Sequence, residues 1–102
     1  MAEKQEIEDF KTAVEALDAL NELAQSLWEQ DEPERACLCE AQIFESSSKL
    51  LGKTHEATLN AMHNYALGLA KTGRDEEAGH VLEEYLDIIA RKEAEKSEHN
   101  AL

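Results

Sequence analysis

Histidine and cysteine are the side chains of this chain best suited to binding a metal ion. They occur as His55, His63, His80, His99, Cys37 and Cys39. No two of the histidines lie three or four residues apart, which is the spacing of metal ligands on one helix. The two cysteines form a C-x-C pair, which matches neither a zinc-ligand spacing nor a disulfide framework. We therefore expect no metal site and no cofactor, with Cys39 in the core and Cys37 partly exposed.

Catalytic signatures are also missing from the sequence. There is no glycine-rich phosphate loop and no nucleophile placed beside a general base. Carboxylates are abundant, but no segment indicates a shielded site that would change their protonation. We therefore expect no catalytic residues and a protein that is not an enzyme.

The charge of the chain limits the kinds of partner it can bind. Ten Lys and Arg face 23 Asp and Glu, giving a formal net charge of −13, and the basic residues form no cluster. Nucleic acids and anionic membranes are bound mainly through Lys and Arg, so we expect neither as a partner. A basic protein segment is the favoured partner. The alternative is that the acidic residues form a solvated helical face that keeps the chain soluble.

Targeting signals are equally sparse. No stretch approaches the roughly 20 apolar residues of a membrane-spanning helix, and the acidic N-terminus does not resemble a signal peptide. Two unpaired cysteines suit a reducing compartment. We expect a cytoplasmic protein.

Two helices are predicted in the first half of the chain. Apolar residues recur every three or four positions from Ile7 to Leu27, which predicts an unbroken helix from about residue 3 to residue 30. Pro33 is suited to the first position of a second helix, over about 33–51, and Gly52 to its C-terminal cap.

Two more helices are predicted in the second half. The third is expected to begin at Thr54 and to stop at Thr72-Gly73, and the fourth to begin at about Asp75. The predicted buried stripe of the fourth helix comprises Ala78, Leu82, Tyr85, Leu86 and Ile89. Residues 93–102 are polar, so we expect them to fray or to continue the helix loosely. No strand is expected, because helix formers dominate and the chain has only one proline and four glycines.

One phrase recurs along the chain. Lys-Thr-Ala-Val-Glu-Ala-Leu at 11–17 is followed by Lys-Thr-His-Glu-Ala-Thr-Leu at 53–59 and by Lys-Ser-Glu-His-Asn-Ala-Leu at 96–102, at spacings of 42 and 43. Small residues repeat in the same phase, since Ala24 and Ala36 correspond to Ala66 and Ala78. Such small pairs let two antiparallel helices approach closely. A period of this length is typical of helical solenoids, whose units cover each other's apolar faces.

The repeat resembles the tetratricopeptide repeat, and within it the 42-residue variety of kinesin light chains. The motifs that carry the resemblance are Leu51-Gly52-Lys53-Thr54-His55, Met62-His63-Asn64-Tyr65-Ala66, Gly73-Arg74-Asp75-Glu76-Glu77-Ala78 and Leu20-Asn21-Glu22-Leu23-Ala24. The resemblance implies one all-α domain over 1–102, a short right-handed solenoid of two antiparallel helix-turn-helix repeats with an extended N-terminal helix. Repeat one covers about 12–51, repeat two about 54–92, and a flexible polar tail 93–102.

The resemblance also implies a binding groove, because in this family the first helix of each unit lines a concave surface that receives a peptide or a partner helix. The corresponding residues here are Asp18, Asn21, Glu22, Gln25 and Trp28 in the first unit, and Asn60, His63, Asn64, Leu67 and Lys71 in the second. Asn and Gln suit this task because each offers a donor and an acceptor to a bound backbone. We expect Asn64 to matter most. The alternative is that these are ordinary polar residues on exposed helix faces.

Three residues depart from the family pattern. Glu56 replaces a usual proline and Asp75 a usual aromatic residue. Glu40 occupies a place that is normally apolar, so it either weakens the packing of the first unit or shifts its register by one residue.

The function implied is that of a non-catalytic adaptor or scaffold that binds a protein partner. Two alternatives stay open. Two repeats leave apolar faces uncovered at both ends, which favours self-association as a homodimer. The second alternative is that the chain is a regulatory piece of a larger signalling protein or enzyme.

Overall fold

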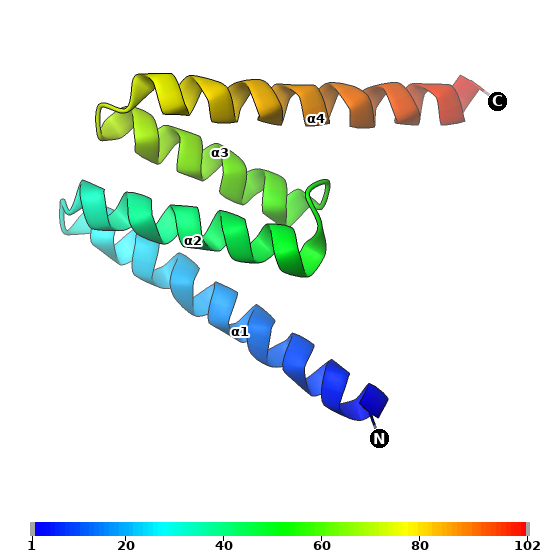
Figure 1. The fold of residues 1–102 in the computed structure, drawn as a ribbon, viewed down its shortest axis with the longest axis horizontal. Coiled ribbons are helices and arrows are strands. Elements are labelled where there is room, and N and C mark those ends of the chain that lie inside the picture. The colour runs from blue at the N-terminus through cyan, green and yellow to red at the C-terminus, as the bar shows by residue number, and fades with distance from the viewer. Residues whose placement is uncertain (1, 102) are drawn as a thin grey trace.

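A computed structural model shows four α-helices joined by short turns (Figure 1). It describes the backbone of residues 2–101 and the side chains of residues 3–98. The helices are α1 (Ala2–Glu29), α2 (Pro33–Leu51), α3 (Glu56–Lys71) and α4 (Asp75–Ala101). The described residues form no strand, which confirms the predicted all-α fold. The side chain of His99 and the end of the third phrase at 96–102 lie outside the described residues.

The turn between α1 and α2 forms where the sequence predicts it. Pro33 occupies the first turn of α2, where its missing N–H leaves no intrahelical hydrogen bond unmade. Asp31 adopts a positive φ of 58°. The N–H of Glu32 then donates to the carbonyl oxygen of Leu27 at 2.9 Å, which closes the end of α1.

The turn between α2 and α3 corrects the predicted start of the third helix. Gly52 has a φ of 89° and its N–H donates to the carbonyl oxygen of Ser48, as expected of a C-terminal cap. The cap of α3 is His55 rather than Thr54, because Nδ1 of His55 accepts a hydrogen bond of 3.0 Å from the N–H of Ala57. The backbone at Thr54 instead serves the turn, where its carbonyl oxygen accepts 2.8 Å from Nζ of Lys92.

The turn between α3 and α4 depends on Gly73. This residue has a φ of 83°, a conformation that costs glycine little. The N–H of Arg74 donates to the carbonyl oxygen of Leu69 at 2.8 Å, and α4 begins at Asp75 as predicted. The helix continues through the polar residues 93–101.

The four helices pack as an open row. Each helix contacts its neighbour in sequence, α1 with α2, α2 with α3 and α3 with α4, and the molecule measures 48 × 40 × 18 Å. The alanines that the repeat phase singles out are buried, with Ala24, Ala36, Ala66 and Ala78 at most 4% exposed. Helix contact through small residues therefore produces a solenoid and not a closed bundle, as predicted.

Two predictions about burial were wrong. Cys37 is only 1% exposed, not partly exposed, because α2 is covered by α1 on one side and by α3 on the other. Leu86 belongs to the predicted buried stripe of α4 but is 60% exposed, and Ile88 is buried in its place. The stripe follows Ala78, Val81, Tyr85 and Ile88, because α4 has a neighbour on only one side.

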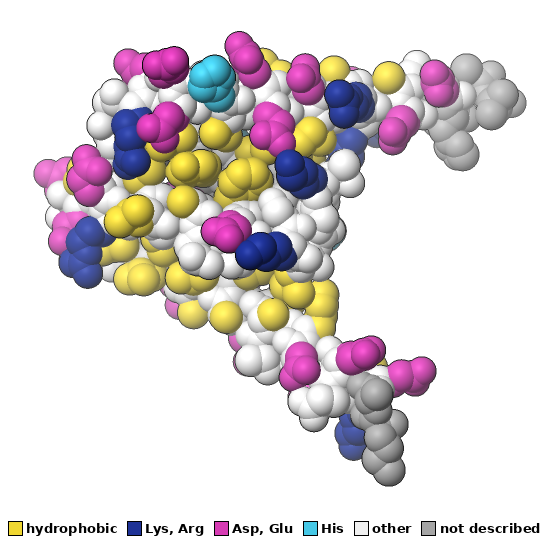
Figure 2. All heavy atoms as spheres, in the orientation of Figure 1, with side chains coloured by type: hydrophobic (Ala, Val, Ile, Leu, Met, Phe, Trp, Pro, Cys, Tyr) yellow, Lys and Arg dark blue, Asp and Glu magenta, His cyan; other side chains and the backbone are white. Residues whose placement is uncertain are grey.

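The outer helices extend beyond the central pair. The N-terminal part of α1 and the C-terminal part of α4 project away from α2 and α3 (Figure 1). Ile7 and Phe10 continue the apolar stripe of α1 but are exposed. Acidic side chains lie along the edge formed by α4, and hydrophobic side chains gather over the middle helices (Figure 2).

Candidate binding groove

Two adjoining hollows lie between α1 and α3, above α2. The larger has a volume of about 460 Å³ and is lined by Asn21, Glu22, Gln25, Trp28, Glu29, Glu40, Asn64, Leu67, Gly68 and Lys71. The smaller, of about 260 Å³, is lined by Val14, Leu17, Asp18, Asn21, Ile43, Ser47, Leu51, Ala57, Asn60, Ala61 and Asn64. Asn21 and Asn64 belong to both hollows, so the two form one continuous groove.

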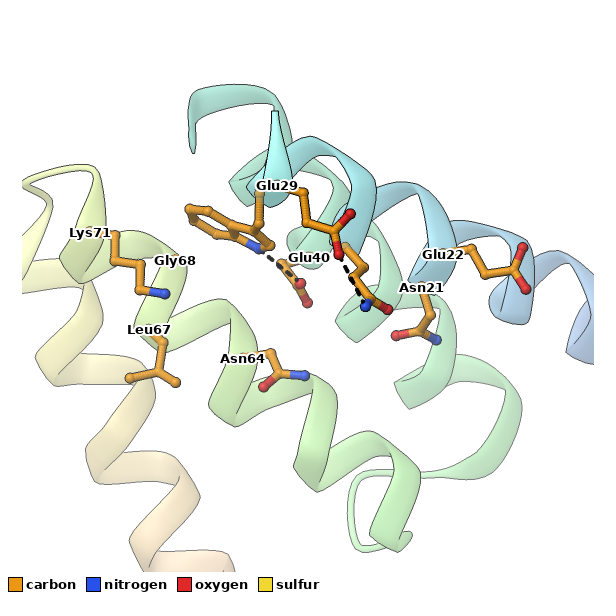
Figure 3. Close-up of a pocket in the computed structure, with 10 residues that line it drawn as sticks. Asn21, Glu22, Glu29, Glu40, Asn64, Leu67, Gly68 and Lys71 are labelled. Atoms are coloured by element: carbon orange, nitrogen blue, oxygen red, sulfur yellow. Dashed lines mark hydrogen bonds between the residues drawn. The ribbon is translucent and has the colours of Figure 1, made fainter. Parts of the chain in front are cut away.

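Both walls of the groove are helices, and polar side chains project from each of them. In the larger hollow Asn21, Glu22 and Glu29 project from α1, and Asn64 and Lys71 project from α3 (Figure 3). Apart from His63, each of the groove residues expected from the sequence lines one of the two hollows. Their positions follow from the solenoid, which places the first helix of each repeat on the same side.

His63 has different surroundings. It lines neither of the two hollows, and its imidazole packs against the ring of Tyr85 in α4, with ring centroids 5.5 Å apart. His63 is adjacent to Asn64 in sequence, and successive residues of a helix point about 100° apart. The exposed imidazole therefore faces α4 while Asn64 faces the groove.

Trp28 closes one end of the larger hollow. Its indole Nε1 donates a hydrogen bond of 3.4 Å to Oε1 of Glu40, and Nζ of Lys71 lies 4.9 Å from its ring centroid. A methyl group built on Gly68 would lie 3.4 Å from Cζ2 of Trp28. The absence of a side chain at residue 68 thus gives the indole its place between α1 and α3.

Glu40 lines the larger hollow although the repeat pattern does not predict it there, and the same holds for Glu29 and Gly68. The side chain of Glu40 rises from α2 into the larger hollow, is 7% exposed, and has an oxygen, Oε2, that is buried without a hydrogen-bond partner. Burial raises the pKa of this carboxyl, and the hydrogen bond from Trp28 lowers it in part. The signal in the sequence was the acidic residue at a normally apolar place of the repeat.

The register of α2 explains how Glu40 is accommodated. Cys39 is buried in the core between α1 and α2, as predicted, and its Sγ lies 3.2 Å from the carbonyl oxygen of Leu20. Glu40 is one residue further and is buried beneath the groove instead. Cys39 and Glu40 therefore lie on two different faces of α2, and both are buried because the helix is covered from both sides.

Three further features concern metal binding, membrane insertion and the two cysteines. No group of three or more His, Cys, Asp or Glu side chains is placed to hold a metal ion within the described part of the chain. None of the helices, over the residues described, is long and apolar enough to cross a membrane. Both cysteines are free and buried, and burial raises the pKa of each thiol.

Comparison with known proteins agrees with the architecture. The sequence model of the tetratricopeptide repeat matches residues 7–91, which cover most of both hairpins. No curated protein and no solved structure gave a significant match to the chain.

Proposed function

Because this chain belongs to the tetratricopeptide repeat family, whose repeats are in general protein–protein interaction modules, we propose that it is a non-catalytic adaptor that binds a partner in its groove. The bound element is an extended peptide or a helix lying between α1 and α3. The observation that carries the proposal is the continuous groove that joins the two hollows through Asn21 and Asn64.

The side chains of the groove suit a protein backbone. Asn21, Gln25, Asn60 and Asn64 are all exposed, and each offers a donor and an acceptor. The Nδ2 of Asn21 donates to the carbonyl oxygen of Leu17, while its Oδ1 is left to accept. A row of amides along two parallel walls can therefore bind the backbone of a partner segment without depending on its sequence.

The charge of the groove favours a basic partner. Glu22, Glu29 and Glu40 line the larger hollow against a single cation, Lys71. The whole chain has a formal net charge of −13. Attraction to Lys and Arg side chains would raise the rate of encounter and select basic segments, with a strong dependence on salt.

Titration of the chain with basic and acidic peptides of equal length, at low and at high salt, tests this proposal. We expect the basic peptides to bind and their affinity to fall about tenfold in high salt, since screening removes the attraction. Asn64→Ala should weaken binding roughly fivefold by removing a hydrogen-bonding amide. Gln42→Ala is the matched control, because this exposed amide of α2 lines neither hollow. Binding that ignores both salt and Asn64 would refute the proposal.

The free cysteines support a reducing location. Cys37 and Cys39 are buried and unlinked, which suits the cytoplasm. We therefore propose that the adaptor acts in the cytoplasm.

Self-association is a second candidate, supported by the uncovered apolar side chains of the outer helices. Ile7 and Phe10 of α1 and Leu86 of α4 are between 46% and 60% exposed. Pairing of two chains through these residues would bury them and extend the groove. Sedimentation at increasing concentration tests this, with Phe10→Asp expected to abolish dimers. A chain that stays monomeric at high concentration removes the candidate.

A further inference from the structure

The unpartnered oxygen of Glu40 points to a more specific ligand. Among the groove side chains Glu40 is unusual, because it is more than nine-tenths buried and yet opens into the larger hollow. Its Oε1 is bonded to Trp28, but its Oε2 has no partner. A buried carboxylate oxygen without a donor is costly, and a cationic group bound beside it would remove that cost.

The surroundings of Glu40 favour a cation. Glu22 and Glu29 lie on the α1 side of the same hollow and add negative charge. Asn64 and Gln25 bring amide oxygens, which accept hydrogen bonds from an ammonium group. The carboxylate of Glu40 lies between the two helices, with Asn64 and Leu67 on the α3 side (Figure 3).

We propose that the larger hollow binds one lysine side chain of the partner segment, with its ammonium group donating to Oε2 of Glu40. The proposal rests on the proposed function, because it names the residue that the groove recognises. Oε2 has almost no exposed surface, so side chains that line the larger hollow have to move aside as the lysine enters. The alkyl part of the lysine then lies against Leu67 and the indole of Trp28.

The geometry favours lysine over arginine. A guanidinium group binds a carboxylate best through two parallel hydrogen bonds, one to each oxygen. At Glu40 the indole of Trp28 already donates to Oε1 and occupies one side of the carboxylate, which leaves Oε2 as the oxygen without a partner. An ammonium group is compact, needs one carboxylate oxygen, and directs its remaining N–H groups to neighbouring amide oxygens.

Lys71 shows that the hollow already accommodates an ammonium group. Its Nζ lies 4.9 Å from the ring centroid of Trp28, at the edge of the same hollow. A second ammonium group at Glu40 would be repelled by this charge, which an exposed lysine can relieve by moving into solvent. Lys71 therefore opposes binding, and Lys71→Gln should tighten it by about threefold.

A small probe tests the hollow directly. Trp28 is the only tryptophan, so the chain has one indole N–H resonance in its ¹H–¹⁵N spectrum. We expect n-butylammonium to shift this resonance saturably, while n-butanol does not and n-butylguanidinium binds more weakly. Glu40→Gln should weaken n-butylammonium binding by about tenfold, because it removes a charge-assisted hydrogen bond.

Two matched variants separate the hydrogen bond from the general field. Glu83→Gln removes one exposed charge of α4, away from both hollows, and should leave the affinity for n-butylammonium unchanged. Glu22→Gln removes a charge at the rim and should weaken binding by about twofold. An equal loss in Glu22→Gln and Glu40→Gln would overturn the proposal, as would tighter binding of n-butylguanidinium.

Peptides distinguish this proposal from the proposed function. A basic peptide and the same peptide with one lysine replaced by norleucine are titrated against the native chain and Glu40→Gln. We expect norleucine at one lysine position to weaken binding to the native chain. The same replacement should not change binding to Glu40→Gln. If basic peptides bind but no position depends on Glu40, the lysine site is refuted and the groove remains. If n-butylammonium binds through Glu40 but no peptide binds, the lysine site stands without the adaptor function.

Discussion

Gly68 of α3 lies directly against Cys37 of α2, and a side chain between them would fit only tightly. A methyl group at residue 68 would be 3.3 Å from Sγ of Cys37 and 3.4 Å from Cζ2 of Trp28. Gly79 in α4 presents the opposite case, because a methyl group there would meet no atom within 4 Å. One substitution therefore has two different expected outcomes.

Replacing each of these two glycines with alanine separates the helix preference of alanine from the effect of packing. Gly79→Ala should raise the free energy of unfolding by roughly 1 kcal/mol, since alanine is favoured over glycine inside a helix. Gly68→Ala has the same favourable helix preference, but the tight contacts with Cys37 and Trp28 offset it. The net change in the free energy of unfolding should therefore be close to zero. Urea denaturation of both variants measures the difference, and equal gains would contradict the tight contact.

The small residues of the repeat can be tested by enlarging one of them. Ala66 is 1% exposed where α3 meets its neighbours, so Ala66→Leu should destabilise the fold by about 3 kcal/mol through overpacking. Ala70→Leu is the control, because Ala70 is exposed on the same helix and should change stability by less than about 0.5 kcal/mol. A well-tolerated Ala66→Leu would mean that close helix approach does not hold the hairpins together.

A hydrogen bond between two helices makes a separate contribution. Oγ1 of Thr58 in α3 donates to the carbonyl oxygen of Ser47 in α2 at 3.1 Å, and Thr58 is 1% exposed. Thr58→Val keeps the shape and removes the donor, so it should cost about 1 kcal/mol in thermal unfolding. Thr12→Val is its control, since exposed Thr12 bonds only within α1, and a similar cost for both would assign the effect to helix preference alone.

The positions of the helices were predictable because local chemistry determines them. Pro33 begins α2, and Gly52 and Gly73 end helices through positive φ values that the sequence signals without any tertiary contact. His55 shows the limit of such reasoning. Thr54 is the more usual capping residue, but the histidine two residues before Ala57 makes the hydrogen bond.

Burial was less predictable, because it depends on how many neighbours a helix has. Cys37 and Glu40 lie on faces of α2 that a two-helix hairpin would leave exposed, and the next repeat covers them. The amides of the groove followed from the repeat pattern. The position of Glu40 in the groove was not predictable, because it depends on how Trp28 of one repeat meets Gly68 of the next.

The buried carboxyl of Glu40 should make stability depend on pH. Desolvation by burial raises its pKa above the ordinary value of 4.5. At pH values between 4.5 and the higher pKa of the folded state, the folded chain therefore holds more protons than the unfolded chain. Its contribution is most favourable below about 4.5 and is lost as the pH rises through the higher pKa of the folded state. Glu22 and Glu29 from α1 and Lys71 from α3 line the same hollow and complete its charge.

Glu40→Gln isolates this contribution, because glutamine stays neutral at every pH. Urea denaturation at pH 4 and at pH 8 should show the variant close to the native chain in acid and more stable than it at pH 8, by about 1 kcal/mol, the scale of one uncompensated buried polar group. Glu83→Gln shows how far the loss of one exposed negative charge, from a chain of net charge −13, changes stability at each pH. The opposite outcome is that the native chain becomes more stable relative to Glu40→Gln as the pH rises. The fold would then already stabilise the carboxylate, which would leave no reason for it to require a cation.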